Sequence, residues 1–229
     1  MFVRMWMTTD VITVTPETPI LEAQDLMKRH NVRRLPVVTQ RGKLVGIVTK
    51  SDILEASPSD ATTLSIWELN YLLARTTVEQ IMVKAEDLIT VSPNDPIERA
   101  ALLMRQHKVG GLPVVDGSHL VGIITESDIF EVLLKLLGVH QKGTRLTLEL
   151  EDRPGALAEV LEVIRDHDVN VRSIVTCDEC RTTPDTGVFV IKIDSYDWRP
   201  IVKDLKDRKI KVLDAQHMNS FGGDPDAAR

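Results

Sequence analysis

The stretch Gly46–Asp52, with the sequence GIVTKSD, returns further along the chain as Gly122–Asp128, GIITESD. In each copy an apolar, β-branched run leads into a hydroxyl, two polar residues and an aspartate. This pattern is typical of a strand that runs into the first turn of a helix. It places a hydroxyl and a carboxylate beside free backbone N–H groups, where an anion can be held. A carboxylate only accepts hydrogen bonds, so it suits the two O–H donors of a sugar diol; a single copy could equally be a helix cap.

The matches around this stretch extend over a whole duplicated unit. Val11–Val14 (VITV) corresponds to Leu88–Val91 (LITV), and Leu35–Val38 (LPVV) to Leu112–Val115 (LPVV), both at an offset of 77 residues. One residue is then lost from the following turn, and the offset becomes 76. Each repeat therefore predicts a short strand, a helix, two strands and a closing helix. Such an α/β unit needs a cover for its sheet, which the second copy can supply.

On these motifs, residues 1 to about 135 resemble a tandem pair of CBS (cystathionine β-synthase) domains, a Bateman module. The resemblance implies a regulatory ligand that contains adenosine, such as AMP, ATP or S-adenosylmethionine, in the cleft between the repeats, and no cofactor. It implies that Asp52 and Asp128 bind the ribose hydroxyls, with Thr49 and Thr125 near ribose or phosphate. It also implies that the early strands lie along the adenine, through Ile12, Val14, Ile89 and Val91.

The repeats diverge just before their LPVV strands. Repeat one has Arg33 and Arg34, where repeat two has Gly110 and Gly111. Arginine forms the best fork for a phosphate, and basic residues at this point contact phosphate in some nucleotide-binding relatives of the CBS family. We therefore expect the two clefts to differ, with phosphate held mainly by side chains of repeat one. The alternative is that the two arginines are a solvated loop pair.

The chain between the repeats predicts a turn followed by a helix with a broad apolar face. Its sequence, SPSDATTLS followed by ELNYLL, resembles the inter-repeat segment of the AcuB-like proteins, which are linked to acetoin utilization. The expected boundaries are CBS domain 1 over residues 1–56, a helical linker over 57–76 and CBS domain 2 over 77–138.

The pattern changes after residue 143. An alternating strand, a turn with the sequence DRPG (Asp152–Gly155), a helix, two strands, a helix and a last strand predict a ferredoxin-like βαββαβ order. Residues 144–217 resemble an ACT domain, an amino-acid-sensing module. The resemblance implies effector contacts from Asp152, Gly155 and Asn170, often across a subunit interface, or a role in dimerisation alone. The predicted fold class is α/β (α+β), a CBS pair followed by this domain and a flexible tail over 218–229, in a homodimer.

Composition narrows the classes of function. The 229 residues carry a net charge of −6, which argues against nucleic-acid binding. Met1–Asp10 is not expected to be a signal peptide, and Ile129–Val139 is too short and too charged for a membrane span. A cytoplasmic protein with no membrane partner is predicted. Cys177 and Cys180 form a Cys-x-x-Cys motif that could be half a zinc site or a redox pair, and we assign no metal site.

The sequence contains no phosphate-binding P-loop, no His-Glu-x-x-His and no Gly-x-Ser-x-Gly. No catalytic residue is therefore assigned. We expect a regulatory sensor that responds to an adenosine-containing ligand and acts on itself or on an unidentified protein partner. The alternatives are an interaction scaffold with empty clefts and, with less support, an enzyme that acts on nucleotides.

Overall fold

The computed structural model describes residues 1–56, 73, 75–177, 179–180 and 183–218. The chain forms two compact units, Met1–Ile129 and Phe130–Arg229. The expected inter-repeat helix and the C-terminal tail beyond Met218 lie outside the described residues. Among those residues, no helix is both long and apolar enough to cross a membrane.

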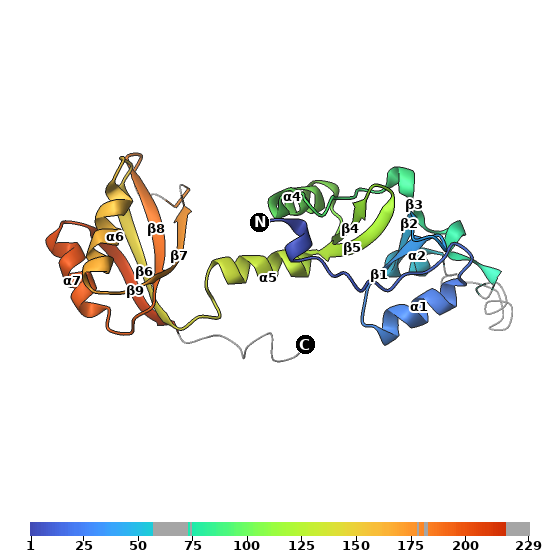
Figure 1. Cartoon of the computed structure of the whole chain (residues 1–229), viewed down its shortest axis with the longest axis horizontal. Helices are drawn as coiled ribbons and strands as arrows, with labels where there is room; N and C mark the ends of the chain where they lie inside the picture. The colour runs from blue at the N-terminus through green and yellow to red at the C-terminus, as the bar shows by residue number, and fades with distance from the viewer. Residues whose placement is uncertain (57–72, 74, 178, 181–182, 219–229) are drawn as a thin grey trace. The chain divides into compact units, whose positions relative to one another are not determined.

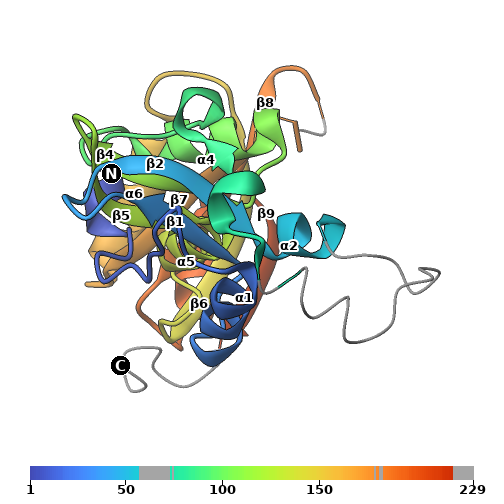
Figure 2. The same ribbon diagram turned by 90° about the vertical axis from the view of Figure 1, so that its right-hand side faces the viewer.

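The first unit holds the two repeats, each with the predicted order of a helix, an antiparallel strand pair and a closing helix (Figure 1 and Figure 2). Repeat one comprises α1 (Ile20–Arg29), β1 (Arg34–Val38), β2 (Leu44–Thr49) and α2 (Lys50–Glu55). Repeat two comprises α4 (Ile97–His107), β4 (Gly111–Asp116), β5 (His119–Thr125) and α5 (Glu126–Leu136). The strand pairs have equivalent registers, because Arg34 lies opposite Thr49 and Gly111 lies opposite Thr125.

The early strands expected at Ile12–Val14 and Ile89–Val91 are shorter than predicted. Each forms a single parallel bridge, Val14 to Val37 and Val91 to Val114. Val14 N–H donates to the carbonyl of Pro36, and Val38 N–H donates to that of Val14. This parallel pairing cannot extend in either direction. Pro36 has no N–H to donate to the residues before Val14, and Pro16, after Val14, has no N–H to donate to β1. Pro113 and Pro93 occupy the same places in repeat two.

The segment before each repeat pairs with a strand of the other repeat. Thr8, which precedes repeat one, exchanges two 2.9 Å backbone hydrogen bonds with Ile123 of β5. The short strand β3 (Val83–Lys84), which precedes repeat two, pairs with β2 of repeat one. Three 3-10 turns accompany these segments: η1 (Val3–Met5), η2 (Val78–Gln80) and η3 (Ala85–Asp87). This exchange of segments joins the two repeats into one unit.

Each repeat buries the apolar face of its first helix against its strands. In repeat one, Ala23 and Met27 of α1 pack with Leu35, Val37 and Val48 of the sheet. The equivalent Ala100 and Met104 of α4 are also buried. The spacing of three and four residues between apolar positions produces this face, as the sequence predicts.

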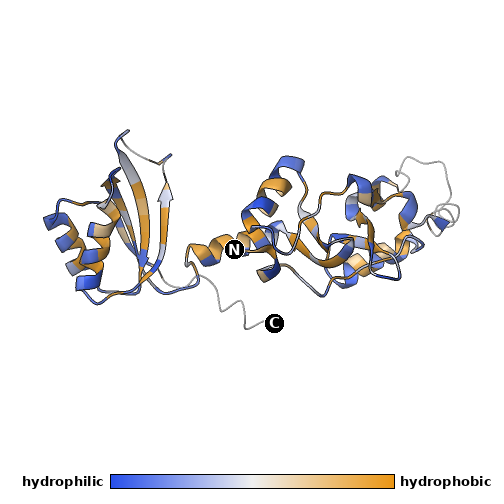
Figure 3. Cartoon of the chain, turned by 45° about the horizontal axis from the view of Figure 1, so that its top comes forward, coloured by the Kyte–Doolittle hydropathy of each residue, from blue (hydrophilic) through white to orange (hydrophobic). Residues whose placement is uncertain are grey.

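The second unit has the predicted βαββαβ order and an antiparallel sheet of strand order β7-β8-β6-β9. Its elements are β6 (Gly143–Glu151), α6 (Ala156–Asp166), β7 (Val171–Cys177), β8 (Thr186–Ile193), α7 (Arg199–Asp207) and β9 (Lys211–Met218). Helices α6 and α7 cover one face of the sheet, as Figure 1 shows, with their polar residues outward in Figure 3. The last strand, β9, pairs along almost the whole of β6.

The opposite face of this sheet buries a cation. Lys192 on β8 is only 3% exposed. Its ammonium group donates a hydrogen bond to the carbonyl of Gly138, and Ser173 Oγ donates to that of Leu137 at 3.3 Å. Burial lowers the pKa of Lys192 below its ordinary value. The lysine and the serine thus donate to two carbonyls just after α5, and the carbonyl of Gly138 also accepts from Gln141 N–H at 3.1 Å.

Candidate functional site

The two repeated aspartates hold the starts of their helices. Thr49 N–H donates to Asp52 Oδ2 at 2.7 Å, and Asp52 N–H donates to Thr49 Oγ1 at 3.4 Å, so the two residues form a capping box. In repeat two, Thr125 N–H and Thr125 Oγ1 both donate to Asp128 Oδ2 at 2.8 Å. The capping role that the sequence left open is therefore present in both copies.

Capping uses only one oxygen of each carboxylate. The Oδ1 atoms of Asp52 and Asp128 make no hydrogen bond to any residue that the structure describes. Both side chains are half-buried, and each lines a cavity. An ionised carboxylate has capacity for several donors, so each aspartate can cap its helix and still accept hydrogen bonds from a ligand.

The cavity at Asp52, the Asp52 cleft, has a volume of about 600 Å³. Thr49 and Asp52 from repeat one form one wall. Ile89 and Lys108 from repeat two form another, because the segment that leads into repeat two is paired with β2. This volume lies in the usual range of small-molecule sites.

The cavity at Asp128, the Asp128 cleft, has a volume of about 460 Å³, and the two repeats exchange their roles in lining it. Thr125 and Asp128 come from repeat two, while Ile12 and Val32 come from repeat one. Each cleft thus combines the Thr-x-x-Asp motif of one repeat with the early segment of the other. The sequence contains no local signal for this crossing, which arises from the exchanged segments.

Two residues expected along the adenine lie away from both clefts. Val14 and Val91 are 5% and 2% exposed and form the parallel bridges described above. Neither lines a cleft, and their contact with a base stays a prediction. Conversely, Asp10, Asp87 and Lys108 line the clefts, although none of the three was predicted as a site residue. They are exposed charged residues, and only the fold brings them to the cavities.

Arg33 and Arg34 line both clefts. The guanidinium of Arg34 lies against the backbone of Gly110 and Gly111: a Cβ atom on Gly110 would lie 2.7 Å from Arg34 Nη2, and one on Gly111 closer still to Nη1. Arg34 and Gly111 hold equivalent places in the repeats, opposite Thr49 and Thr125. The glycines therefore leave room for one guanidinium between the clefts, and a second arginine at Gly111 would enter the same space.

The charge on Arg34 is partly shielded from water. Desolvation by burial lowers the pKa of its guanidinium below the ordinary value. The nearby Glu126 carboxylate raises this pKa, and the positive charge of Arg33 lowers it further. Arg33, in contrast, is exposed. The structure thus separates the two arginines that the sequence treated as one pair, and Arg34 is the more enclosed of the two.

Moving the arginine from one repeat to the other tests this packing. We expect Gly111→Arg to destabilise the first unit by about 2 kcal/mol, within the range for overpacked sites, because Arg34 already fills the space. Adding Arg34→Gly should recover most of that loss, since one guanidinium then remains. Urea unfolding of the two single variants and the double variant measures the coupling. Arg33→Gly combined with Gly111→Arg is the matched control, and an equal rescue there would contradict the assignment.

The three residues proposed for an effector in the second unit lie at two ends of one helix. Asp152 and Gly155 precede α6, and Gly155 has a positive φ of 89° at its N-cap. Asn170 follows α6 and lines a cavity of about 510 Å³ with Asp168 and Val171. The 11 residues of α6 span about 16 Å at the usual helical rise. One copy of the domain does not bring all three residues to one place.

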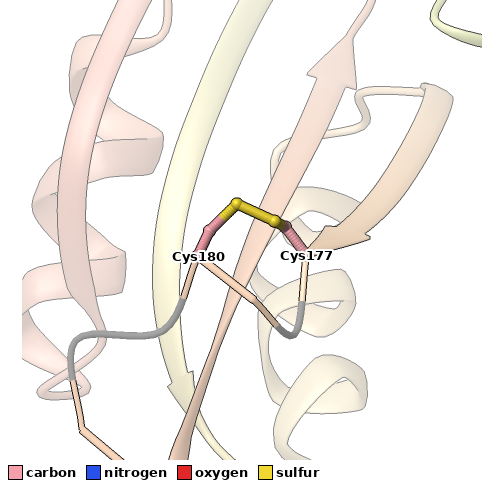
Figure 4. Close-up of a disulfide and its surroundings, with 2 residues drawn as sticks. All are labelled: Cys177 and Cys180. Carbon is pink, nitrogen blue, oxygen red and sulfur yellow. A yellow bond between two sulfur atoms is a disulfide. The ribbon is translucent and has the colours of Figure 1, made fainter.

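The Cys-x-x-Cys motif closes a loop between β7 and β8. Cys177 and Cys180 form a disulfide, shown in Figure 4, with their Cα atoms 5.2 Å apart. Both sulfur atoms are therefore in the oxidised form of a redox pair, and neither is a thiolate that could bind zinc. Among the described residues there is no group of three or more His, Cys, Asp or Glu side chains placed to hold a metal ion.

The two clefts lie within segments that match a known family. The family model for the CBS domain matches residues 3–59 and 78–135, which together make up half of the chain. The chain belongs to the CBS domain family. The model for the ACT domain matches residues 144–197, in the second unit. Both resemblances seen in the sequence are thus confirmed, and so is the fold class of a CBS pair followed by an ACT domain.

Similar proteins include a small CBS protein, a crystal structure and an enzyme. The CBS domain-containing protein YhcV of Bacillus subtilis is 38% identical over 127 residues, which are 56% of this chain and 81% of YhcV. The proposed acetoin utilization protein AcuB of Vibrio cholerae is 32% identical, with a TM-score of 0.51, over 61% of this chain and 94% of that one. Inosine-5'-monophosphate dehydrogenase of Thermoplasma acidophilum is 40% identical over 121 residues, 52% of this chain. That match covers only 21% of the dehydrogenase and lies in the CBS part.

Proposed function

We propose that this protein is a non-catalytic regulatory sensor whose CBS pair binds an adenosine-containing ligand of the AMP, ATP or S-adenosylmethionine class. The observation that carries the proposal is the duplicated carboxylate. Asp52 and Asp128 each use one oxygen to cap a helix and keep the other without a hydrogen bond among the described residues. Each lines a cavity of nucleoside size, and each cavity has an isoleucine on the wall from the other repeat.

The parts of such a ligand match the parts of each cleft. The two ribose hydroxyls would donate to the aspartate oxygen that capping leaves available. Ile89 in the Asp52 cleft and Ile12 in the Asp128 cleft offer apolar surface to the adenine. Arg33 and Arg34 would bind a phosphate. Because both repeats contribute to each cleft, a bound ligand favours the arrangement in which the repeats lie together, and it can shift a conformational equilibrium by its difference in affinity.

The ACT domain is proposed to act between two copies of the chain. Asp152 and Gly155 lie at one end of α6 and Asn170 at the other, so an effector that touches all three needs a second copy. This arrangement supports a homodimer whose ACT domains pair, with or without a small amino acid bound. Light scattering on the purified chain, with and without added amino acids, measures the oligomeric state directly.

The pathway in which the sensor acts is a separate proposal. The similarity to AcuB covers most of that protein, so acetoin utilization is the first pathway in which to seek a regulated partner. A cytoplasmic location stays a prediction from the composition. CBS and ACT domains are regulatory modules, and the enzyme relative described above matches only through its CBS part.

A thermal-shift panel tests the sensor function. We expect AMP, ADP, ATP, S-adenosylmethionine or 5′-methylthioadenosine to raise the unfolding temperature of the first unit, since a ligand at a hundred times its Kd stabilises by about 2.7 kcal/mol. The Asp52→Asn, Asp128→Asn double variant is the control. Asparagine keeps one oxygen for the cap but places an N–H₂ donor where the second carboxylate oxygen stood. A tenfold loss of affinity at each cleft should therefore reduce the stabilisation by about half, while the ligand-free stability stays close to that of the wild type.

Two outcomes would contradict this function. The absence of a shift with every adenosyl compound would favour the scaffold alternative with empty clefts. Conversion of a nucleotide during incubation, followed by chromatography of the products, would favour the enzyme alternative. A further shift on addition of single amino acids would identify the ACT domain as a second sensor, whose affinity must then be coupled reciprocally to that of the nucleotide.

A further inference from the structure

The two clefts share their arginines but differ in their remaining charges. Besides Arg33 and Arg34, the Asp52 cleft is lined by two lysines and two carboxylates: Lys50, Lys108, Asp52 and Asp87. The Asp128 cleft is lined by three carboxylates and, among its other described lining residues, by no lysine or arginine: Asp10, Glu126 and Asp128. The two lysines thus balance the two carboxylates of the Asp52 cleft, while nothing among these residues balances the three carboxylates of the Asp128 cleft.

The difference begins inside the motif itself. Lys50 follows Thr49 in repeat one, and Glu126 follows Thr125 at the equivalent position of repeat two. The equivalence is structural as well, because Lys50 N–H donates to the carbonyl of Arg33 at 2.9 Å and Glu126 N–H to that of Gly110 at 3.3 Å. Each side chain is exposed and lines its own cleft, so the same position carries a positive charge in one cleft and a negative charge in the other.

The shared guanidinium sharpens this difference. Arg34 lies on the glycines at the start of β4, near the Glu126 carboxylate, which contributes a favourable charge interaction. The space holds one guanidinium, so a phosphate that engages Arg34 from the Asp52 cleft leaves the carboxylates of the Asp128 cleft without that cation. A second phosphate in the Asp128 cleft would then face three carboxylates with Arg33 as the remaining cation among the described lining residues, which is unfavourable at short range.

We propose that the two clefts take ligands of different charge: the Asp52 cleft binds a phosphorylated adenine nucleotide, and the Asp128 cleft binds an adenosine derivative that carries no phosphate. The proposal rests on the proposed function, in that both clefts bind adenosyl ligands, and it adds which class each one accepts. The protein would then read a phosphorylated and a phosphate-free adenosine compound at once, and not two copies of one nucleotide.

Calorimetric titration of the full chain with ADP and with 5′-methylthioadenosine tests the proposal. We expect ADP to saturate at one molecule per chain. Asp52→Asn should weaken ADP binding at least tenfold, because hydrogen bonds to a charged group are lost, and should leave 5′-methylthioadenosine in the Asp128 cleft within twofold of the wild type. Asp128→Asn should do the reverse. Both variants keep the helix cap, so each serves as the matched control for the other.

A charge exchange provides a second and independent arm. In the Lys50→Glu, Glu126→Lys double variant, the sensitivity of ADP affinity to Asp128→Asn should rise and its sensitivity to Asp52→Asn should fall. Both exchanged side chains are exposed, so the fold should tolerate the swap. Two equal ADP sites per chain, or equal losses of ADP affinity in the two asparagine variants, would overturn the sorting by charge while leaving the sensor function intact. Failure of both compounds to bind would remove the sensor function and this proposal with it.

Discussion

The Gly46→Val variant is expected to lose about 3 kcal/mol of stability in the CBS pair, at the upper end of the range for overpacked sites. A Cβ atom at Gly46 would lie 2.7 Å from the backbone carbonyl oxygen of Val83 and 2.6 Å from Met82 Sδ. The carbonyl belongs to β3, which pairs with β2 and cannot move away without breaking that pairing. Glycine in the GIVTKSD motif is therefore required by the close approach of the exchanged segment.

Urea unfolding of the full chain measures this loss. The matched control is Gly117→Asn, in the turn between β4 and β5, where no heavy atom lies within 4 Å of an added Cβ. Its positive φ of 62° suits asparagine better than other side chains, so we expect little change. Gly46→Val with the stability of wild type would show that β3 is not held against β2 in solution.

The Ile191→Ala variant is expected to destabilise the ACT domain by about 2–5 kcal/mol, the cost of removing a large buried aliphatic side chain. Ile191 lies on β8, is fully buried, and packs in the core with Leu146 and Leu148 of β6 and with α6. The two units have separate cores. The variant should therefore lower the unfolding transition of the second unit and leave the nucleotide-dependent transition of the CBS pair in place.

Ile174→Ala is the control for this prediction. Ile174 lies directly opposite Ile191 on the edge strand β7, but it is 39% exposed, so its truncation removes fewer contacts. A loss in Ile174→Ala as large as that in Ile191→Ala would show that the exposed edge is covered in solution. That result would identify β7 as part of the dimer contact proposed above.

The duplicated motifs predicted the fold well because they are local. The order of elements in each repeat follows from apolar spacing and from turn residues, and both are readable along the chain. The early strands were overestimated, since the effect of Pro16 and Pro36 on a parallel ladder depends on which residues pair. Pairing between repeats, such as that of Thr8 with Ile123, has no local pattern at all.

The candidate site was predicted only in part for the same reason. Asp52 and Asp128 stand out because the motif repeats, and the arginines stand out because the repeats differ there. The sequence could not show that Arg34 and Gly111 compete for one space, since that fact depends on the approach of two equivalent positions in three dimensions. The disulfide between Cys177 and Cys180 could not be predicted from the sequence, because the short spacing of the two cysteines fits a redox pair and a metal half-site equally well.

The exchange of segments between the repeats also sets the order of events during synthesis. Thr8 leaves the ribosome about 115 residues before its partner Ile123. At the usual speed of translation this delay is roughly 6 to 23 seconds, far longer than the time in which a helix forms. Repeat one can meanwhile fold with β3, whereas the segment around Thr8 has no partner until β5 of repeat two has been made. The nascent chain therefore holds an unpaired segment around Thr8 until β5 emerges, and a chaperone that binds extended segments would protect it.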